Sequence, residues 1–198
     1  MLEALTGTGL ATAAGLNAYI PLLTVGLLSR FTDVITLPDS WRWLENPWVL
    51  GIIAVLLVIE LIADKVPVVD HINDVVQTAV RPTAGGLTFG ASSSSETVTV
   101  DDPAAFFADH SWVPILVGVV LALLVHAAKA AVRPVVNSTT MGLGAPVVST
   151  LEDGVSLSMS VVAILLPLLV LAFLIGLAAL FWWLWRRRAQ RRAAQSVT

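Results

Sequence analysis

The stretch Glu60–Leu87, ELIADKVPVVDHINDVVQTAVRPTAGGL, decides how this chain can fold. It follows a strongly apolar run and carries four acids at helical spacing. Glu60 and Asp64 are four residues apart, as are Asp70 and Asp74, so each pair shares one face of a helix. Ionisable residues near membrane depth are costly and usually line a polar interior or a pathway. This stretch is therefore the main candidate for a functional site.

The composition predicts an all-α integral membrane protein. Of 198 residues, 57% are hydrophobic and 13% are charged, about half the charged content of a soluble domain. Several apolar runs are long enough to cross a bilayer. The chain has no cysteine, which excludes disulfides, thiolate metal sites and a cysteine nucleophile. No basic patch with interleaved aromatic residues predicts nucleic-acid binding.

The apolar runs predict about four regular transmembrane helices and two irregular, broken or re-entrant segments. The regular spans are Thr8–Leu28, Val49–Val66, Trp112–Val132 and Ser160–Trp185, and the irregular segments are Val68–Leu87 and Asn137–Met159. The arginine-rich end of the chain places that end in the cytoplasm by the positive-inside rule. Either all six segments cross, with both termini cytoplasmic, or four cross and two are re-entrant or interfacial.

Residues 1–185 then form a single transmembrane domain that contains a flexible acidic loop, 90–111, and residues 186–198 form a basic cytoplasmic tail. The seven tryptophans lie at the ends of apolar runs, where membrane-interface aromatics belong. We expect them at the interface.

The first predicted span contains a polar, helix-breaking insert, Gly15–Pro21 (GLNAYIP). In one interpretation its small residues allow close helix packing and Asn17 donates an interhelical hydrogen bond. In the other, the helix is discontinuous and its freed carbonyls face a cavity.

The segment after the second span predicts an amphipathic helix over Val68–Val80, with valines and an isoleucine on one side and polar residues on the other. Arg81-Pro82 is expected to stop this helix, and Ala84–Gly86 is expected to form a flexible exit. A weak internal repeat pairs Pro67–Asp70 (PVVD) with Pro134–Asn137 (PVVN). Broken segments in corresponding halves are a pointer to a transport site.

Glu60 and Asp64 cannot easily both be ionised on one face of a partly buried helix. One takes up a proton, a cation lies between them, or Lys65 or Arg133 compensates their charge. The first two alternatives suit a proton-coupled carrier or a cation site, whereas the third is a structural ion pair. Asp70 and Asp74 either belong to the site or form the solvated face of the amphipathic helix.

A second acidic pair, Glu152 and Asp153, could complete the site from the other half of the chain, with Asn17 and Asn137 as neutral ligands. Oxygen ligands suit a hard cation such as Mg²⁺, Ca²⁺ or Mn²⁺. The alternative is that the two acids, which follow Ser149-Thr150, mark the start of a helix. We expect no cofactor other than such a bound cation.

A basic group, His126, Lys129 and Arg133, lies along one side of the Trp112–Val132 span. Lys129 and Arg133 could contact a lipid headgroup or an anionic substrate, or they could simply anchor the span on the cytoplasmic side. No His-x-x-x-His or Gly-x-Ser-x-Gly pattern is present. The sequence therefore does not predict an enzyme.

The motifs GLNAYIPLL (15–23), IELIADKVPVVDHINDVV (59–76), RPTAGG (81–86) and HAAKAAVRP (126–134), and the later STLED run (149–153), carry a resemblance that covers nearly the whole chain. The chain resembles a domain-of-unknown-function family, family 4126, of small bacterial integral membrane proteins. The resemblance implies a location in the bacterial inner membrane and no particular activity.

The leading hypothesis is a small membrane transporter or channel for a cation, or one coupled to protons. Its acidic centre would contain Glu60, Asp64, Asp70 and Asp74, with Glu152 and Asp153 opposite. The alternatives are a non-transporting scaffold or accessory subunit and, with less support, a lipid-phosphate carrier. The expected partners are the lipid bilayer, a small ion or solute, and a second copy of the chain in a homodimer.

Overall fold

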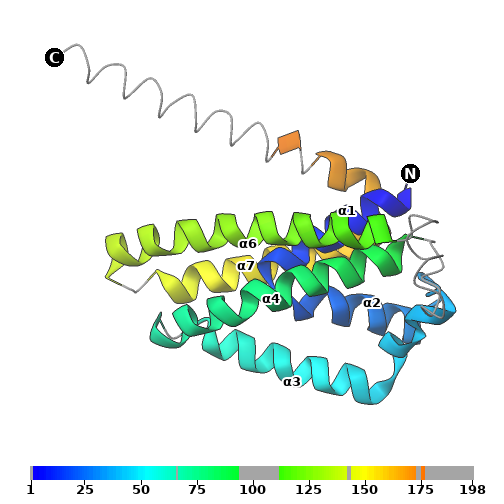
Figure 1. The fold of residues 1–198 in the computed structure, drawn as a ribbon, viewed down its shortest axis with the longest axis horizontal. Coiled ribbons are helices and arrows are strands. Elements are labelled where there is room, and N and C mark those ends of the chain that lie inside the picture. Colours follow the sequence, from blue (N-terminus) through cyan, green and yellow to red (C-terminus); the bar gives the residue numbers. More distant parts are fainter. Residues whose placement is uncertain (1, 66, 94–111, 142–143, 173–174, 177–198) are drawn as a thin grey trace, which may run out of the picture.

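The computed structural model describes residues 2–65, 67–93, 112–141, 144–172 and 175–176. All regular structure in these ranges is helical, which confirms the all-α prediction. The elements are α1 (Leu2–Leu16), α2 (Tyr19–Phe31), the 3₁₀ helix η1 (Asp39–Glu45), α3 (Pro47–Ala63), α4 (Pro67–Ser92), α6 (Trp112–Thr140) and α7 (Ala145–Leu165) (Figure 1).

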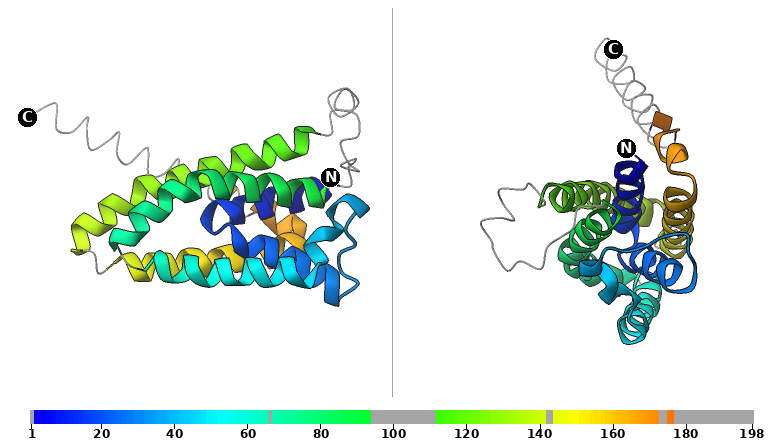
Figure 2. Two further views of the ribbon diagram at one scale, coloured as in Figure 1. Left: turned by 60° about the horizontal axis from the view of Figure 1, so that its bottom comes forward. Right: turned by 90° about the vertical axis from the view of Figure 1, so that its right-hand side faces the viewer.

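Helices α1 and α2 form a helical hairpin, which we call the re-entrant pair for its shape: α1 enters from one end of the molecule and α2 returns to that same end (Figures 1 and 2). Leu2, near the start of α1, lines the same hollow as Val34, which follows α2. The expectation of one continuous span over Thr8–Leu28 is therefore wrong. The chain turns because the side-chain oxygen of Asn17 accepts the backbone N–H groups of Tyr19 and Ile20, at 3.1 and 3.2 Å, and so starts a new helix.

The longer helices α3, α4, α6 and α7 run along the molecule, and the re-entrant pair lies among them (Figure 2). Helix α1 packs mainly against α4, α6 and α7, whereas α2 contacts α3, α7, α4 and η1. The bend between α1 and α2 is therefore placed inside the protein rather than at either end.

Helix α4 includes the predicted amphipathic helix over Val68–Val80 but does not stop at Arg81-Pro82. Pro82 lies inside the helix. The two glycines that follow it, expected as a flexible exit, are helical and pack against α6. A Cβ at Gly85 would collide with Ala122, and one at Gly86 would meet Val119. Close packing of α6 holds this part of the chain helical, so local breaker signals do not decide its structure.

The boundary predicted at Ser160 is also wrong, because α7 runs through it from Ala145 to Leu165. A proline at the start of α7 suits the first helical turn. Leu166, next to Pro167, leaves the helical conformation, and helix resumes over 167–172. Helix α6 is longer than predicted, to Thr140.

The first residues of the predicted acidic loop, 90–92, belong to α4, and 94–111 lie outside the described residues, as does the basic tail, 186–198. The two tetrapeptides of the internal repeat have different settings: Pro67 begins α4, whereas Pro134 lies inside α6. The two tetrapeptides therefore do not occupy equivalent positions in their helices.

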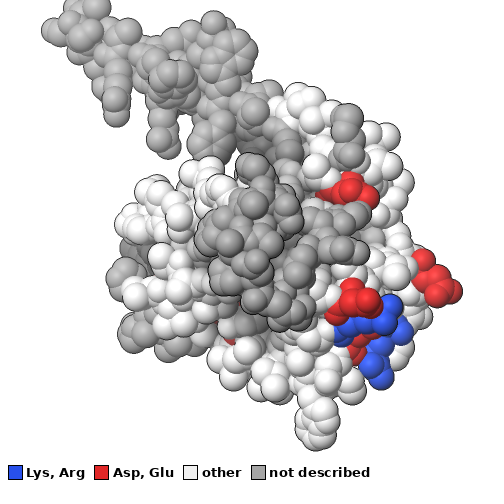
Figure 3. Space-filling model, turned by 45° about the vertical axis from the view of Figure 1, so that its right-hand side comes forward, with Lys and Arg blue, Asp and Glu red and all other residues white. Residues whose placement is uncertain are grey.

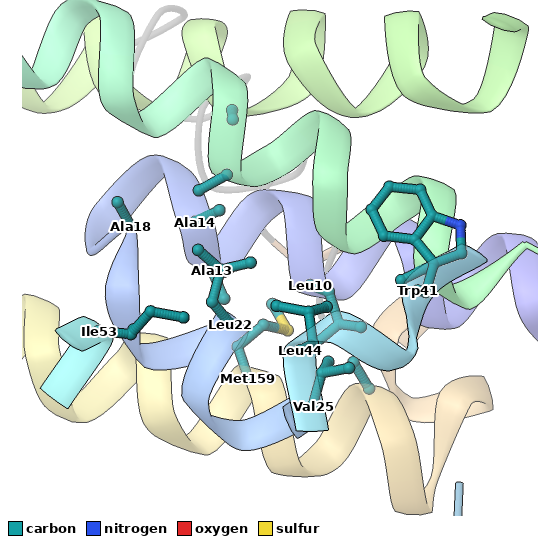
Figure 4. Packing of buried hydrophobic residues seen from close by; sticks show 14 of the residues in the cluster. Leu10, Ala13, Ala14, Ala18, Leu22, Val25, Trp41, Leu44, Ile53 and Met159 are labelled. Atoms are coloured by element: carbon teal, nitrogen blue, oxygen red, sulfur yellow. The ribbon is translucent and has the colours of Figure 1, made fainter. Parts of the chain in front are cut away.

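The apolar core surrounds the re-entrant pair. Leu10, Val25, Leu44 and Met159 pack together from α1, α2, η1 and α7 (Figure 4). Trp41 is also buried in this cluster, at 4% exposed, and therefore contributes to the protein core. η1 thus covers one end of the core.

Two helices in the described part of the chain, α6 and α7, are long and apolar enough to cross a membrane, or three spans if η1 and α3, bent by 59°, count as one. The outer face of α3 exposes Ile52, Val55, Ile59 and Ile62. On the face in Figure 3, the Lys, Arg, Asp and Glu of the described residues lie towards one side, and the rest of the described surface there is largely free of charge. The count of six crossings stays a prediction.

Candidate functional site

Seven charged side chains from four elements meet around the bend of the re-entrant pair. We call this set the charge cluster. Its members are Glu60 and Asp64 at the end of α3, Arg81 of α4, Lys129 and Arg133 of α6, and Glu152 and Asp153 of α7. The five residues from α3, α4 and α6 are at most 6% exposed.

Arg81 links one side of the cluster to His126. Its Nη2 donates to Glu60 Oε1 at 3.0 Å, and both side chains are essentially inaccessible to solvent. Its Nη1 lies 3.0 Å from His126 Nδ1, and His126 Nε2 lies 3.0 Å from Thr78 Oγ1. A guanidinium can only donate, so Nδ1 accepts and the ring proton of a neutral His126 belongs on Nε2, facing Thr78.

Asp64 is the carboxylate of the charge cluster with the most cationic neighbours. Its Oδ2 accepts from Lys129 and from Arg133, each at 3.1 Å, and Arg81 lies 3.6 Å away. Its Oδ1 accepts from Asn73 Nδ2 at 2.7 Å. Three cations and one amide therefore converge on a single buried acid.

Glu152 is the second acceptor for the α6 cations. Its Oε2 lies 3.0 Å from Lys129 Nζ and 2.9 Å from Arg133 Nη2. Since the two cations each contact both Asp64 and Glu152, α3, α6 and α7 are held together by one alternating set of charges. Removing one of these four residues would leave the other three with an unbalanced charge in a buried site.

The bend between α1 and α2 reaches into this set. The carbonyl of Leu16, left without a helical partner, accepts from Lys129 Nζ at 3.1 Å. Asn17 Nδ2 donates to Asp153 Oδ1 at 2.9 Å. Both interpretations of the insert hold in part: the helix is discontinuous between Leu16 and Tyr19, Asn17 donates an interhelical hydrogen bond, and Gly15 packs closely against α6. The freed carbonyl of Leu16 faces a buried ammonium group.

The structure brings together most of the residues proposed from sequence: Glu60, Asp64, Glu152, Asp153, Asn17, Lys129 and Arg133. Asp74 is partly buried in α4 beside the cluster. The side chains of Asp70 and Asn137 lie outside the described residues.

Two alternatives can be corrected. Glu152 and Asp153 lie in the middle of α7 rather than in its first turn, so they do not mark the start of a helix. Lys129 and Arg133 do not form an open cationic patch, because both contact Asp64 and Glu152. Within the described ranges, no group of three or more His, Asp or Glu side chains is arranged to hold a metal ion.

Arg81 is the member of the charge cluster that the sequence analysis does not predict, because Arg81-Pro82 is typical of a helix stop. The spacing of buried residues in α4 does indicate its position. Gln77, Arg81, Ala84 and Thr88 continue one helical face past Pro82, and all four are buried.

Two hollows flank the re-entrant pair. One, of about 700 Å³, opens where α1 begins and reaches Leu10 and Val25, one on each arm of the pair. The other is a groove of about 570 Å³ among α2, α3 and α7, and it contains Lys65 and Asp153. The two hollows reach the re-entrant pair from different sides.

A model of the protein family described as "Domain of unknown function (DUF4126)" matches residues 4–187. This range includes every member of the charge cluster and confirms the resemblance noted in the sequence. No curated protein and no solved structure matches the chain.

Proposed function

The chain belongs to the family of the domain of unknown function DUF4126, and we propose that it is a small, proton-coupled membrane transporter or channel whose working centre is the charge cluster. The observation that carries the proposal is the contact between this buried cluster and the bend of a re-entrant helix pair. We place the protein in the bacterial inner membrane, where a homodimer would be its assembled form.

The energetic cost of the cluster supports a role beyond packing. Burying ion pairs gives little net stability, because desolvation offsets the attraction between the charges. Charged side chains among apolar helices are accordingly rare and mark pathways or relays. Glu60, Asp64 and Arg81 are each at most 2% exposed. Their burial therefore carries this desolvation cost.

Protons fit this site better than a metal ion. Cations of the protein already lie between the carboxylates, so Lys129 and Arg133 occupy the positions that a bound cation would take between Asp64 and Glu152. Glu60 Oε2 is buried and has no hydrogen-bond partner in the described part of the chain. It can accept a proton without first breaking a bond, and the neutral acid would then hold Arg81 by a hydrogen bond alone, without the attraction between opposite charges.

The re-entrant pair is the element that could move when the charge of the cluster changes. Discontinuous helices at transport sites present backbone carbonyls and helix ends to a polar centre, and irregular backbone at membrane depth is tolerated only inside protein or beside a cavity. Leu16 and Asn17 are held by Lys129 and Asp153. A shift of charge in the cluster would therefore act directly on the bend, between the two hollows.

The scaffold alternative rests on a specific observation: the described cations of the cluster all face carboxylates, so the set is compatible with a purely structural role. The lipid-phosphate carrier has less support, because Lys129 and Arg133 would have to leave their carboxylates to bind an anion.

The deciding experiment is proton flux into proteoliposomes, followed with an internal pH-sensitive dye under an imposed pH gradient and membrane potential. Wild type is compared with Glu60→Gln, which retains the shape of the side chain and removes its titration. Asp39→Asn is the matched control, because the Asp39 side chain is 89% exposed and forms a surface ion pair with Arg42 of the same 3₁₀ helix.

We expect flux in wild type and in Asp39→Asn, and its loss in folded Glu60→Gln. A wild-type protein that carries no protons and moves no solute with them would refute the proposal and favour the scaffold. Equal flux in all three proteins would show that Glu60 is not part of the coupling.

A further inference from the structure

The groove of about 570 Å³ among α2, α3 and α7 has an apolar body and one charged end. Its floor is α2, which contacts both α3 and α7 and lies between them in the end-on view of Figure 2. The body is lined by Leu23, Leu27, Leu57, Leu61 and Leu157. A slot of this size and composition suits a hydrocarbon chain.

The charged end is formed by Lys65, which follows the last turn of α3. Its Nζ donates to the Leu61 carbonyl at 2.9 Å and lies 3.9 Å from Asp153 Oδ2. The ammonium group has three protons, and the side chain is 40% exposed. The other oxygen of Asp153, Oδ1, accepts from Asn17. Lys65 is therefore loosely paired and can meet an anion that arrives from outside.

We propose that this groove binds an anionic phospholipid, with one acyl chain along α2 and the phosphate at Lys65. The headgroup contact falls to Lys65, because its side chain is 40% exposed whereas Asp153, the acid at the same end of the groove, is 14% exposed. The lysine also lies at the end of α3, where a long basic side chain reaches the headgroup level. The inference rests on the membrane location but not on transport, so the two can fail separately.

A second apolar hollow, of about 390 Å³, runs along α7 and shares Thr150 and Gly154 with the groove. A diacyl lipid could therefore straddle α7 at Gly154, with one chain in each hollow. A Cβ added at Gly154 meets no atom within 4 Å, so a larger side chain there would extend into the space that the lipid would occupy.

The experiment is native mass spectrometry of the detergent-solubilised chain after incubation with phosphatidylglycerol or, separately, with phosphatidylcholine. Three variants are compared with wild type. Lys65→Gln removes the headgroup contact, Gly154→Leu fills the groove, and Gly51→Leu is the matched control, because a Cβ at Gly51 also meets nothing within 4 Å and Gly51 lines neither hollow.

We expect wild type and Gly51→Leu to retain phosphatidylglycerol in preference to phosphatidylcholine. Lys65→Gln should weaken phosphatidylglycerol binding about fivefold, as one lost lysine near a headgroup predicts, and Gly154→Leu should weaken binding of both lipids. Circular dichroism should show unchanged helix content in all variants.

Equal lipid retention in Gly154→Leu and Gly51→Leu would overturn the proposal. A wild-type dimer that Gly154→Leu converts to monomer, with lipid binding unchanged, would also overturn it and assign the groove to a second copy of the chain.

Discussion

At the scale of single residues, Arg81 is the side chain on which the buried charges depend most directly. It contacts Glu60 and His126 and lies near Asp64, and none of its surface is exposed. Arg81→Met should destabilise the protein by about 3–5 kcal/mol, because it leaves a buried carboxylate without its cation. The double variant Glu60→Gln/Arg81→Met should recover part of this loss. The free energy of unfolding of both variants can be measured in detergent micelles.

The acids of the site could be predicted from sequence, and their partners could be predicted only in part. Glu60, Asp64, Glu152 and Asp153 stand out as charges in apolar runs, and Arg133 was already a candidate counter-charge. Arg81 was missed because a following proline is a strong local stop signal. Its burial depends on α3 and α6, which are distant in sequence. If Arg81→Met were as stable as wild type, the central place given to this residue would be wrong.

At the scale of elements, the bend between α1 and α2 depends on one amide. Asn17 accepts two backbone N–H groups of α2 and donates to Asp153. Asn17→Ala should cost more than the roughly 1 kcal/mol typical of a lost helix cap, because Asp153 loses a partner as well. Asn46→Ala is the control, since Asn46 caps α3 by accepting one backbone N–H, from Trp48. Thermal unfolding that ranks the two variants equally would contradict this account.

The contact between α4 and α6 depends on glycine. A Cβ at Gly118 would collide with the Gly85 backbone, whereas one at Gly51 meets nothing. We therefore expect Gly118→Ala to lower the melting temperature by several degrees. Gly51→Ala should be neutral or stabilising by up to about 1 kcal/mol, because alanine favours helix. A stabilising Gly118→Ala would show that α4 and α6 are less closely packed than described.

At the scale of the whole molecule, the re-entrant pair sets the orientation of the chain. Thr32 follows α2, and Glu3 lies at the start of α1, at the same end of the structure. Thr139, near the end of α6, lies at the other end (Figure 1). Because the chain has no cysteine, Glu3→Cys, Thr32→Cys and Thr139→Cys each introduce a single thiol for labelling.

A membrane-impermeant maleimide should label Glu3→Cys and Thr32→Cys from one side of sealed vesicles and Thr139→Cys from the other. Labelling of Glu3→Cys and Thr32→Cys from opposite sides would restore the single span over Thr8–Leu28 and refute the re-entrant pair. Detergent-opened vesicles control for thiols that are buried.

The sequence by itself determined the helical class, the apolar runs and the acids that interrupt them, because composition and helical period are local properties of the chain. Tertiary structure alone decided that the first apolar run turns back, that α4 continues past Pro82, and that Arg81 meets Glu60. These outcomes depend on contacts between segments far apart in sequence. Within a membrane helix, glycine, proline and asparagine favour a break or a close contact equally well, and the neighbouring helices decide between the two.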